Sequence, residues 1–245
     1  MPFLSRKTGQ FTYFSQQVGD ADWRGKSVLD FGGNVGNILR DPASTIDEDH
    51  YWCIDVVKTS VERGRETFPR ANWCFYDRYC FFFNPNGVPE LPVPDLGRRF
   101  DYIVAYSVFT NTSHTDMIQL VGQLEEMLTP TGTLAFTFID PNHRSWPGFN
   151  GNNYEWRLQN DRGNLDAPET RELIERAKGA SWFMLVNADE LYVEREDIRA
   201  YPPEEQKTCH VFHTVGYMRS LFPQATILPP ANSEMQHCCV IRRTS

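Results

Sequence analysis

The sequence predicts an α/β fold, a doubly wound and mostly parallel sheet of seven strands. Three observations support this: strand-like and helix-like segments alternate over the first 140 residues, a glycine-rich turn follows the first strand, and single carboxylates end the next two strands. Alternating strands and helices pair in parallel through right-handed crossovers. Such sheets bind ligands at the carboxyl ends of their strands.

Five segments of the first half have strand character because they are short and rich in apolar residues. They cover residues 26–32, 51–57, 71–77, 100–109 and 133–140. Between the first strands we expect a brief helix over 34–40, which ends before Pro42, and a longer helix from about Thr59 to Phe68. Residues 78–99 carry four prolines and are predicted to form a long loop.

A third helix is predicted over residues 113–128. Ser113 is placed to cap its N-terminus, and Asp116 lies in the first turn. Its apolar stripe consists of Met117, Val121, Leu124 and Leu128. Residues 129–132 ("TPTG") are expected to end this helix before the fifth strand.

The pattern is less regular after Asp140. Residues 141–165 are rich in Asn, Gly and aromatic residues, which predicts a loop. The other expected elements are a helix over 169–178, two short strands within 181–194, a helix over 214–222 and strands over 225–228 and 236–243. At 245 residues the chain fits a single domain. Its parts are an N-terminal segment (1–27), a core (28–140), an inserted segment (141–210) and a C-terminal helix with strands (211–245).

Composition excludes several classes of function. A net charge of -8 and a pI near 5.3 argue against nucleic acid as a partner, because phosphate neutralisation needs clustered Lys and Arg. No apolar run reaches the roughly 20 residues of a membrane span, and the N-terminus lacks the apolar core of a signal peptide. We therefore expect a cytoplasmic monomer or homodimer that binds a small molecule and does not contact membranes.

The stretch "VLDFGGNVGNIL" (28–39) passes from a strand into the glycine-rich turn. A dinucleotide site requires G-x-G-x-x-G, and here Asn34 and Asn37 replace the second and third glycines after Gly32. No Gly-Lys-Ser or Gly-Lys-Thr follows, which excludes a Walker loop. NAD, FAD and nucleoside triphosphates therefore fit poorly.

The turn instead resembles the first motif of class I S-adenosylmethionine-dependent methyltransferases, acidic-x-Gly-x-Gly-x-Gly. Asp30, Gly32, Asn34 and Gly36 occupy its four places, with Asn34 at the middle glycine. The cofactor of that family has no pyrophosphate, so the backbone need not approach it as closely. Asn is also one of the few residues that tolerate a positive φ.

Later motifs extend the resemblance over residues 28–140. It implies that Asp55 accepts bonds from both ribose hydroxyls and that Asp77 takes the adenine amino group. "FDYIVAYSVFTN" and "LEEMLTPTGTLAFTF" match the following strands and helix, with Asn111 where many members have histidine and Thr131 where glycine is usual. The implied cofactor-binding residues are Asp30, Gly32, Gly33, Asn34, Gly36, Asn37, Asp55, Val56, Asp77, Arg78, Tyr106 and Tyr13.

Alternatives stay open for three of these positions. Asp55 could bind only backbone amides, and Asp77 could pair with Arg78 at the surface. Asp30 could support the turn without contacting the ligand. The N-terminal aromatics, among them Tyr13, suit either a lid over the cofactor or core packing.

A sulfonium methyl group is already a strong electrophile, so the enzyme mainly positions the acceptor and excludes water. A hydroxyl acceptor benefits from a base, and the candidates are His143 and His114, at the carboxyl edge of the sheet. We predict no metal, because the fourth strand ends without an acid. Aromatic residues of the inserted segment suggest a pocket, with a satellite core as the alternative. The predicted substrate-binding residues are Trp146, Tyr154, Trp156 and His213.

The sequence thus predicts a methyltransferase that acts on an oxygen of a small molecule, in specialised metabolism. One alternative is transfer to nitrogen or a carboxylate of a small molecule or peptide. Another is a methyltransferase-like protein that binds without transferring a methyl group, because a fold does not fix a reaction.

Overall fold

A mixed sheet forms the centre of the computed structural model, which describes residues 9–144, 146–194, 209–231 and 235–243. Five strands pair in parallel in the spatial order β3-β2-β1-β4-β5, which confirms the predicted class. Their bounds are Val28–Phe31 (β1), Tyr51–Asp55 (β2), Asn72–Phe75 (β3), Phe100–Ala105 (β4) and Leu128–Ile139 (β5). Beyond β5 lie β10 (Gln236–Arg242) and β9 (Thr226–Leu228), each antiparallel to its neighbour.

Helices cover both faces of this sheet. On one face, α1 (Gln10–Val18) packs against β5 and β10, and α2 (Lys58–Thr67) follows β2. On the other face lie α3 (His114–Glu126) and α6 (Val215–Leu221), whose apolar side chains join a cluster with β4, β5 and β10. The cap of α3 is confirmed: the Ser113 side chain accepts from the Asp116 amide. All four residues of its predicted stripe are buried.

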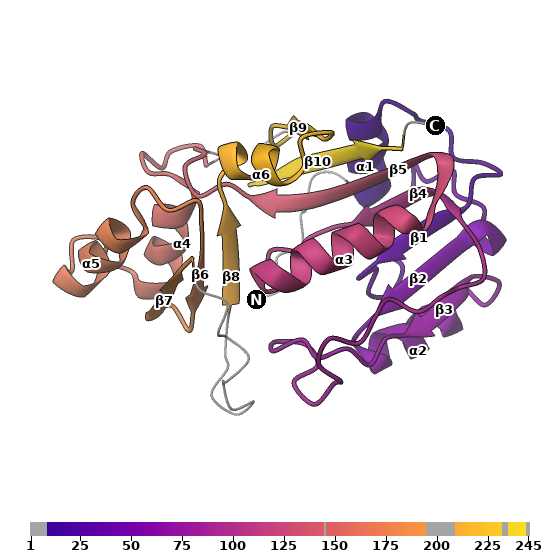
Figure 1. Cartoon of the computed structure of the whole chain (residues 1–245), viewed down its shortest axis with the longest axis horizontal. Coiled ribbons are helices and arrows are strands. Elements are labelled where there is room, and N and C mark those ends of the chain that lie inside the picture. Colours follow the sequence, from indigo (N-terminus) through magenta and orange to yellow (C-terminus); the bar gives the residue numbers. More distant parts are fainter. Residues whose placement is uncertain (1–8, 145, 195–208, 232–234, 244–245) are drawn as a thin grey trace.

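The sheet has ten strands among the described residues, so the predicted count of seven is too low. The added strands are β8 (Cys209–His213), β6 (Trp182–Val186) and β7 (Glu190–Val193). Strand β8 pairs with β5 at Phe212 and Ile139, beyond the point where β4 leaves β5 at Ala105. We call β6, β7, β8 and the helices α4 (Asn153–Arg162) and α5 (Pro168–Ala177) the cap. Figure 1 shows the cap at one end of the molecule and α2 with β3 at the other.

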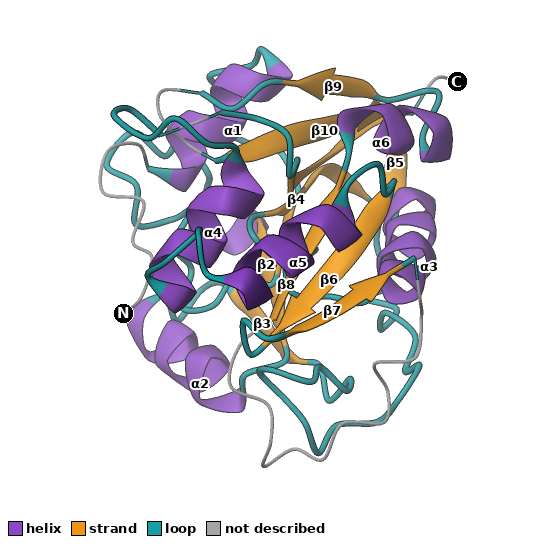
Figure 2. Ribbon diagram, turned by 90° about the vertical axis from the view of Figure 1, so that its left-hand side faces the viewer, coloured by secondary structure: helices purple, strands orange, loops and turns teal. Residues whose placement is uncertain are grey.

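A satellite core holds the cap together. Tyr154 and Leu158 of α4 and Leu173 of α5 pack with Phe183 and Phe212 of the strands. Figure 2 shows α4 and α5 in front of the strands that they cover. The cap therefore has its own apolar interior next to the carboxyl end of β5.

Three local predictions are wrong. Residues 34–40 form turns and not a helix, because Asn34 and Gly36 both have positive φ (54° and 78°). Residues 129–132 belong to β5, whose register with β4 shifts between Phe100 and Tyr102. The predicted loop 141–165 contains α4, which a capping box of Asn152 and Glu155 begins.

The N-terminal aromatics pack into the core. Phe11, Tyr13 and Phe14 of α1 are each at most 2% exposed and share a cluster with Trp23. Of the two interpretations of this segment, the structure favours core packing; residues 1–8 lie outside the described part. A short 3₁₀ helix, η1 (Glu48–His50), precedes β2. None of the helices in the described residues has the length and apolar character needed to cross a bilayer.

Candidate functional site

The glycine-rich turn lies directly at the carboxyl end of β1. The Gly32 amide donates to the carbonyl of Ile54 in β2 at 2.7 Å. Gly32, Asn34 and Gly36 all have positive φ, which confirms the predicted backbone tolerance at Asn34. The Asn34 side chain is exposed, whereas Asn37 is half-buried. The turn therefore presents its backbone and one asparagine at this edge.

Asp30 supports the turn from beneath. Its carboxyl group is 1% exposed and accepts from the Tyr51 hydroxyl at 2.8 Å. A Cβ at Gly33 would lie 2.4 Å from Oδ2 of Asp30, so only glycine allows the backbone to lie this close. Burial raises the pKa of Asp30 to about 7, and the negative charge of Asp55 adds to the shift. This arrangement favours a supporting role for Asp30 and no direct ligand contact.

Asp55 ties the second strand to the same turn. Its Oδ2 accepts from the Asn34 amide at 2.8 Å and its Oδ1 from the Val57 amide at 2.7 Å. Burial raises the pKa of this carboxyl, which is 6% exposed. The alternative of backbone-bound oxygens is thus realised, but it does not exclude a ligand. The Val56 amide also bonds to this carboxyl. An ionised carboxylate has about four acceptor positions, so about one stays open for a hydroxyl donor such as that of a ribose.

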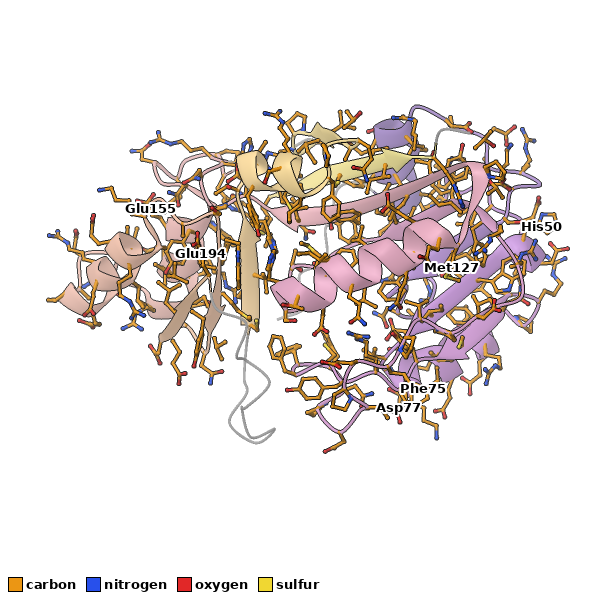
Figure 3. The ribbon with its side chains drawn as sticks, viewed as in Figure 1. His50, Phe75, Asp77, Met127, Glu155 and Glu194 are labelled. Carbon is orange, nitrogen blue, oxygen red and sulfur yellow. The ribbon has the colours of Figure 1, made fainter. Side chains whose placement is uncertain are left out.

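Asp77 and Arg78 follow β3 and point apart. Asp77 is exposed and accepts from the Asn84 side chain at 3.0 Å; Figure 3 shows it beside Phe75 at the rim of the molecule. Arg78 is 3% exposed and pairs with Asp116 of α3. The alternative pairing of Asp77 with Arg78 is therefore wrong. The guanidinium also donates to Gln119, so a role of Arg78 toward a cofactor would require these bonds to break.

Tyr13 and Tyr106 meet on the α1 face of the sheet. Their rings lie 5.6 Å apart at an interplanar angle of 85°. Tyr106 is half-buried at the end of β4, and the Tyr13 hydroxyl donates to the Gln236 carbonyl at 3.5 Å. Contact of either residue, or of Val56, with a cofactor stays a prediction.

His114 and His213 lie together in a buried cluster. His114 Nδ1 is 3.2 Å from His213 Nε2, and His114 Nε2 is 3.0 Å from the Tyr217 hydroxyl. The His114 ring stacks on Trp182 at 4.3 Å. Burial lowers the pKa of His213 to about 3, and the neighbouring His114 adds to the shift. Both nitrogens of His114 are engaged within the protein, which favours a structural role for it; its catalytic role stays a prediction.

His143 lies after β5 and is half-buried. Its ring contacts His237 of β10 edge to face, with centroids 4.8 Å apart. Burial lowers the pKa of His237 to about 4, so this imidazole is neutral near pH 7. Sequence reasoning missed this pairing because β5 and β10 become neighbours only in the antiparallel register of Phe138 with His237.

The aromatic residues of the cap divide into two groups. Trp146 and Trp156 stack at 4.0 Å with an interplanar angle of 10°, and both are half-buried. Tyr154 is 4% exposed inside the satellite core, and its hydroxyl donates to the Leu173 carbonyl at 3.3 Å. The alternative of a satellite core therefore describes Tyr154, while contact of Trp146 and Trp156 with a substrate stays a prediction.

The cap extends the sheet where β4 ends. The Val211 amide of β8 donates to the Thr110 carbonyl at 2.8 Å, which joins the cap to the segment after β4. Phe81, from the loop after β3, packs with Met184 and Val211 of the cap. The carboxyl ends of the central strands are thus flanked by the glycine-rich turn, this loop and the cap.

Comparisons with known proteins agree with this geometry. Residues 29–134 match the model of a family described as a methyltransferase domain. A search of curated proteins gives no match.

Solved structures share the fold at low sequence identity. The glycopeptide N-methyltransferase MtfA in complex with S-adenosylmethionine is 12% identical, with 98% of this chain and 95% of that chain covered and a TM-score of 0.51. The 1,6-didemethyltoxoflavin-N1-methyltransferase of Burkholderia thailandensis is 12% identical over 96% of this chain and 76% of that chain, with a TM-score of 0.50.

A third structure, the mitomycin 7-O-methyltransferase, is 13% identical over 96% of this chain, with a TM-score of 0.51. This chain spans about half the length of that relative (54%) and of the pyocyanin biosynthetic protein PhzM (55%). The family match and the shared fold confirm the resemblance based on Asp30, the glycine-rich turn and Asp55. Residues 29–134 thus match a methyltransferase domain, and the chain shares the fold of the S-adenosylmethionine-dependent methyltransferases.

Proposed function

We propose that this protein transfers the methyl group of S-adenosylmethionine to an oxygen of a small-molecule acceptor, in specialised metabolism. One observation carries the cofactor half of this proposal. The Asp55 carboxylate holds the middle of the glycine-rich turn through the Asn34 amide, so an acceptor of ribose bonds and an open backbone lie side by side. The cap beside the same edge supports the acceptor half.

The residues at this edge have distinct roles in the proposal. The cofactor supplies an electrophilic methyl group when bound. Asp55 accepts from a ribose hydroxyl, and the backbone from Gly32 to Asn37 holds its methionine end. Asp77 is exposed at the end of β3 and accepts the adenine amino group. Asp30 stays beneath Gly33 and fixes the turn.

The acceptor is held between the central strands and the cap. The stacked pair of Trp146 and Trp156 offers an apolar surface for a planar or apolar molecule. His143 takes the proton of the attacking hydroxyl, since it is half-buried beside β5 and its neighbour His237 is neutral. Positioning and exclusion of water supply most of the acceleration.

The charge of the chain supports a small-molecule acceptor over a nucleic acid. The net charge of -8 gives no basis for binding a polyanion.

The test has two stages. Calorimetry with S-adenosylmethionine and S-adenosylhomocysteine is expected to show binding; no binding by the folded protein would end the proposal. Labelled cofactor is then incubated with the protein and an extract of its native cells. A methyl ether that resists base supports the proposal, a base-labile ester points to a carboxylate, and a methylamine points to nitrogen. Cofactor binding without any labelled product would instead indicate a binding protein.

A further inference from the structure

A closed set of hydrogen bonds joins three segments at the carboxyl edge of the sheet. Ser107, just after β4, donates from its amide to the Thr137 hydroxyl of β5 at 2.7 Å. Thr137 donates to Oε1 of Gln236 in β10, and Gln236 Nε2 donates to the Ser107 hydroxyl at 3.1 Å. The Thr137 hydroxyl accepts one bond and donates the other, and Gln236 accepts through Oε1 and donates through Nε2, which fixes the orientation of the Gln236 amide.

The set continues into the segment after Ser107. The Ser107 and Thr110 hydroxyls lie 3.1 Å apart, and Thr110 donates to the Ser107 carbonyl at 3.0 Å. Asn111 donates to the same carbonyl at 3.2 Å. Thr137 is fully buried and Gln236 is 9% exposed, so these bonds form out of water, where unpaired partners are costly.

Ser107 has a φ of 59°, a conformation that a residue with a Cβ rarely adopts. Such a backbone persists when its surroundings determine it, and it is enriched at functional sites. The turn at Ser107 takes the chain out of the sheet, and β8 enters the place on β5 beyond β4. The hydrogen bonds from Thr137 and Gln236 hold Ser107 in this conformation.

Two consequences of this turn reach the candidate site. Val108 is brought against the glycine-rich turn, where a Cβ on Gly32 would lie 2.4 Å from Cγ2 of Val108. Thr110 is placed to accept from Val211, which joins the cap to the core. One turn thus contacts both the cofactor loop and the cap.

We propose that Gln236 and Thr137 are positioning residues that set the Ser107 turn and, through Val108 and Thr110, the geometry of the cofactor loop and the cap. They touch neither substrate nor cofactor in this scheme. The link to cofactor affinity rests on the proposed function, whereas the link between the turn and the cap does not.

The first experiment compares two threonines on one face of β5. Thr137→Val removes both hydrogen bonds with little change in shape. Thr133→Val is the matched control, since Thr133 is buried on the same strand and its hydroxyl has no hydrogen bond among the described residues. We expect Thr137→Val to weaken binding of S-adenosylhomocysteine at least tenfold by calorimetry and Thr133→Val to leave it unchanged. Equal affinities of the two variants would overturn the proposal.

The second experiment uses Gln236. Gln236→Met removes both bonds at every pH. In Gln236→Glu, a protonated carboxyl can again accept from Thr137 and donate to Ser107, whereas the ionised form can only accept and places a negative charge in this buried site. Affinity in Gln236→Glu is therefore expected to recover toward the wild-type value as pH falls from 8 to 5, and not in Gln236→Met. Wild-type protein measured over the same pH range controls for the titration of other groups near this site, which are Tyr13, Tyr106, Asp140 and His237. Equal pH profiles of the two variants would contradict the proposal.

A third measurement needs no cofactor. The amides of Ser107 and Val211 report the turn and its contact with the cap, and their hydrogen exchange is expected to rise at least tenfold in Thr137→Val and not in Thr133→Val. Unchanged exchange would overturn the positioning role even if the protein binds its cofactor. Faster exchange in a protein that binds no S-adenosylhomocysteine would keep the positioning role and end the proposed function.

Discussion

The glycine-rich turn and the histidine cluster both bury titratable groups, but they satisfy them differently. At the turn, the Asp55 carboxylate accepts from backbone amides and keeps an acceptor position for a ligand. In the cluster, His114 bonds to His213 and Tyr217, and the ring of Trp182 covers it. Burial alone therefore does not mark a site; the open positions of the buried group decide whether a ligand can bind.

The two regions also respond to pH in opposite directions. The folded-state pKa of Asp30 is raised to about 7, so folded protein keeps a proton that the unfolded chain loses above about pH 4, and stability falls as pH rises through this window. The folded-state pKa of His213 is lowered to about 3, so the unfolded chain gains a proton below about pH 6.5 and stability falls as pH decreases.

The largest expected effect is on the affinity for the cofactor, and it distinguishes the carboxylate of Asp55 from that of Asp77. Asp55→Ala leaves the Asn34 and Val57 amides without their acceptor, and we expect affinity for S-adenosylmethionine to fall at least 100-fold, about 3 kcal/mol. Asp77→Ala is the comparison, because Asp77 is exposed and in the proposal contributes a single solvent-screened bond to the adenine amino group besides its bond to the Asn84 side chain. Its affinity is expected to fall less than tenfold by calorimetry, and a larger loss for Asp77 than for Asp55 would reverse our assignment.

The histidine cluster is tested through its pH dependence. His213→Gln keeps a donor toward His114 but removes the titrating imidazole. Between pH 6.5 and 5 the wild type is expected to lose about 2 kcal/mol more stability than this variant, at about 1.4 kcal/mol per pH unit. Urea unfolding measures the difference. At pH 8 the imidazole is neutral in both states, so the comparison there isolates packing; parallel pH profiles would show that His213 does not titrate as proposed.

Two glycine-to-alanine substitutions with opposite expected effects on stability test the close packing of the turn. Gly33→Ala places a Cβ 2.4 Å from Oδ2 of Asp30 and 2.9 Å from Sγ of Cys53, and overpacking of this kind costs about 2 kcal/mol. Gly122→Ala lies on the exposed side of α3 with no atom near the added Cβ, so it is expected to stabilise by about 0.5–1 kcal/mol. Thermal unfolding of both variants checks the signs, and a stabilised Gly33→Ala would contradict the close contact with Asp30.

The last prediction concerns Asp30, whose effect is about 1 kcal/mol for each pH unit. Asp30→Asn keeps an acceptor for Tyr51 and removes the titration, so its stability relative to the wild type is expected to improve by about 1 kcal/mol per pH unit between pH 5 and 7. Unfolding in urea at both pH values provides the measurement. A constant difference across this range would show that the carboxyl does not hold its proton in the folded protein.

The sequence by itself determined the parallel core and the resemblance to methyltransferases. The signals for these features depend on residues that are close together in the chain. They are the short apolar strands, the N-cap and apolar stripe of the helix predicted over Ser113–Leu128, and the spacing from Asp30 through Gly36 to Asp55. Asn34 is the clearest case: we expected asparagine to tolerate a positive φ at this place in the motif, and the structure has its φ at 54°.

The sequence also held a signal that we did not use. Asn152 and Glu155 form the capping box that begins α4, and Gly163 ends this helix in the left-handed conformation. We predicted a loop because the composition of the region is polar.

Other features depended on tertiary structure because they join segments that are distant in the chain. Arg78 has Asp77 beside it in sequence, but burial against α3 gives it Asp116 as its partner. His143 meets His237 only because β5 and β10 pair in antiparallel register. The bonds among Ser107, Thr137 and Gln236 arise the same way: each residue is unremarkable alone, and the sheet edge that brings them together gives them a common role.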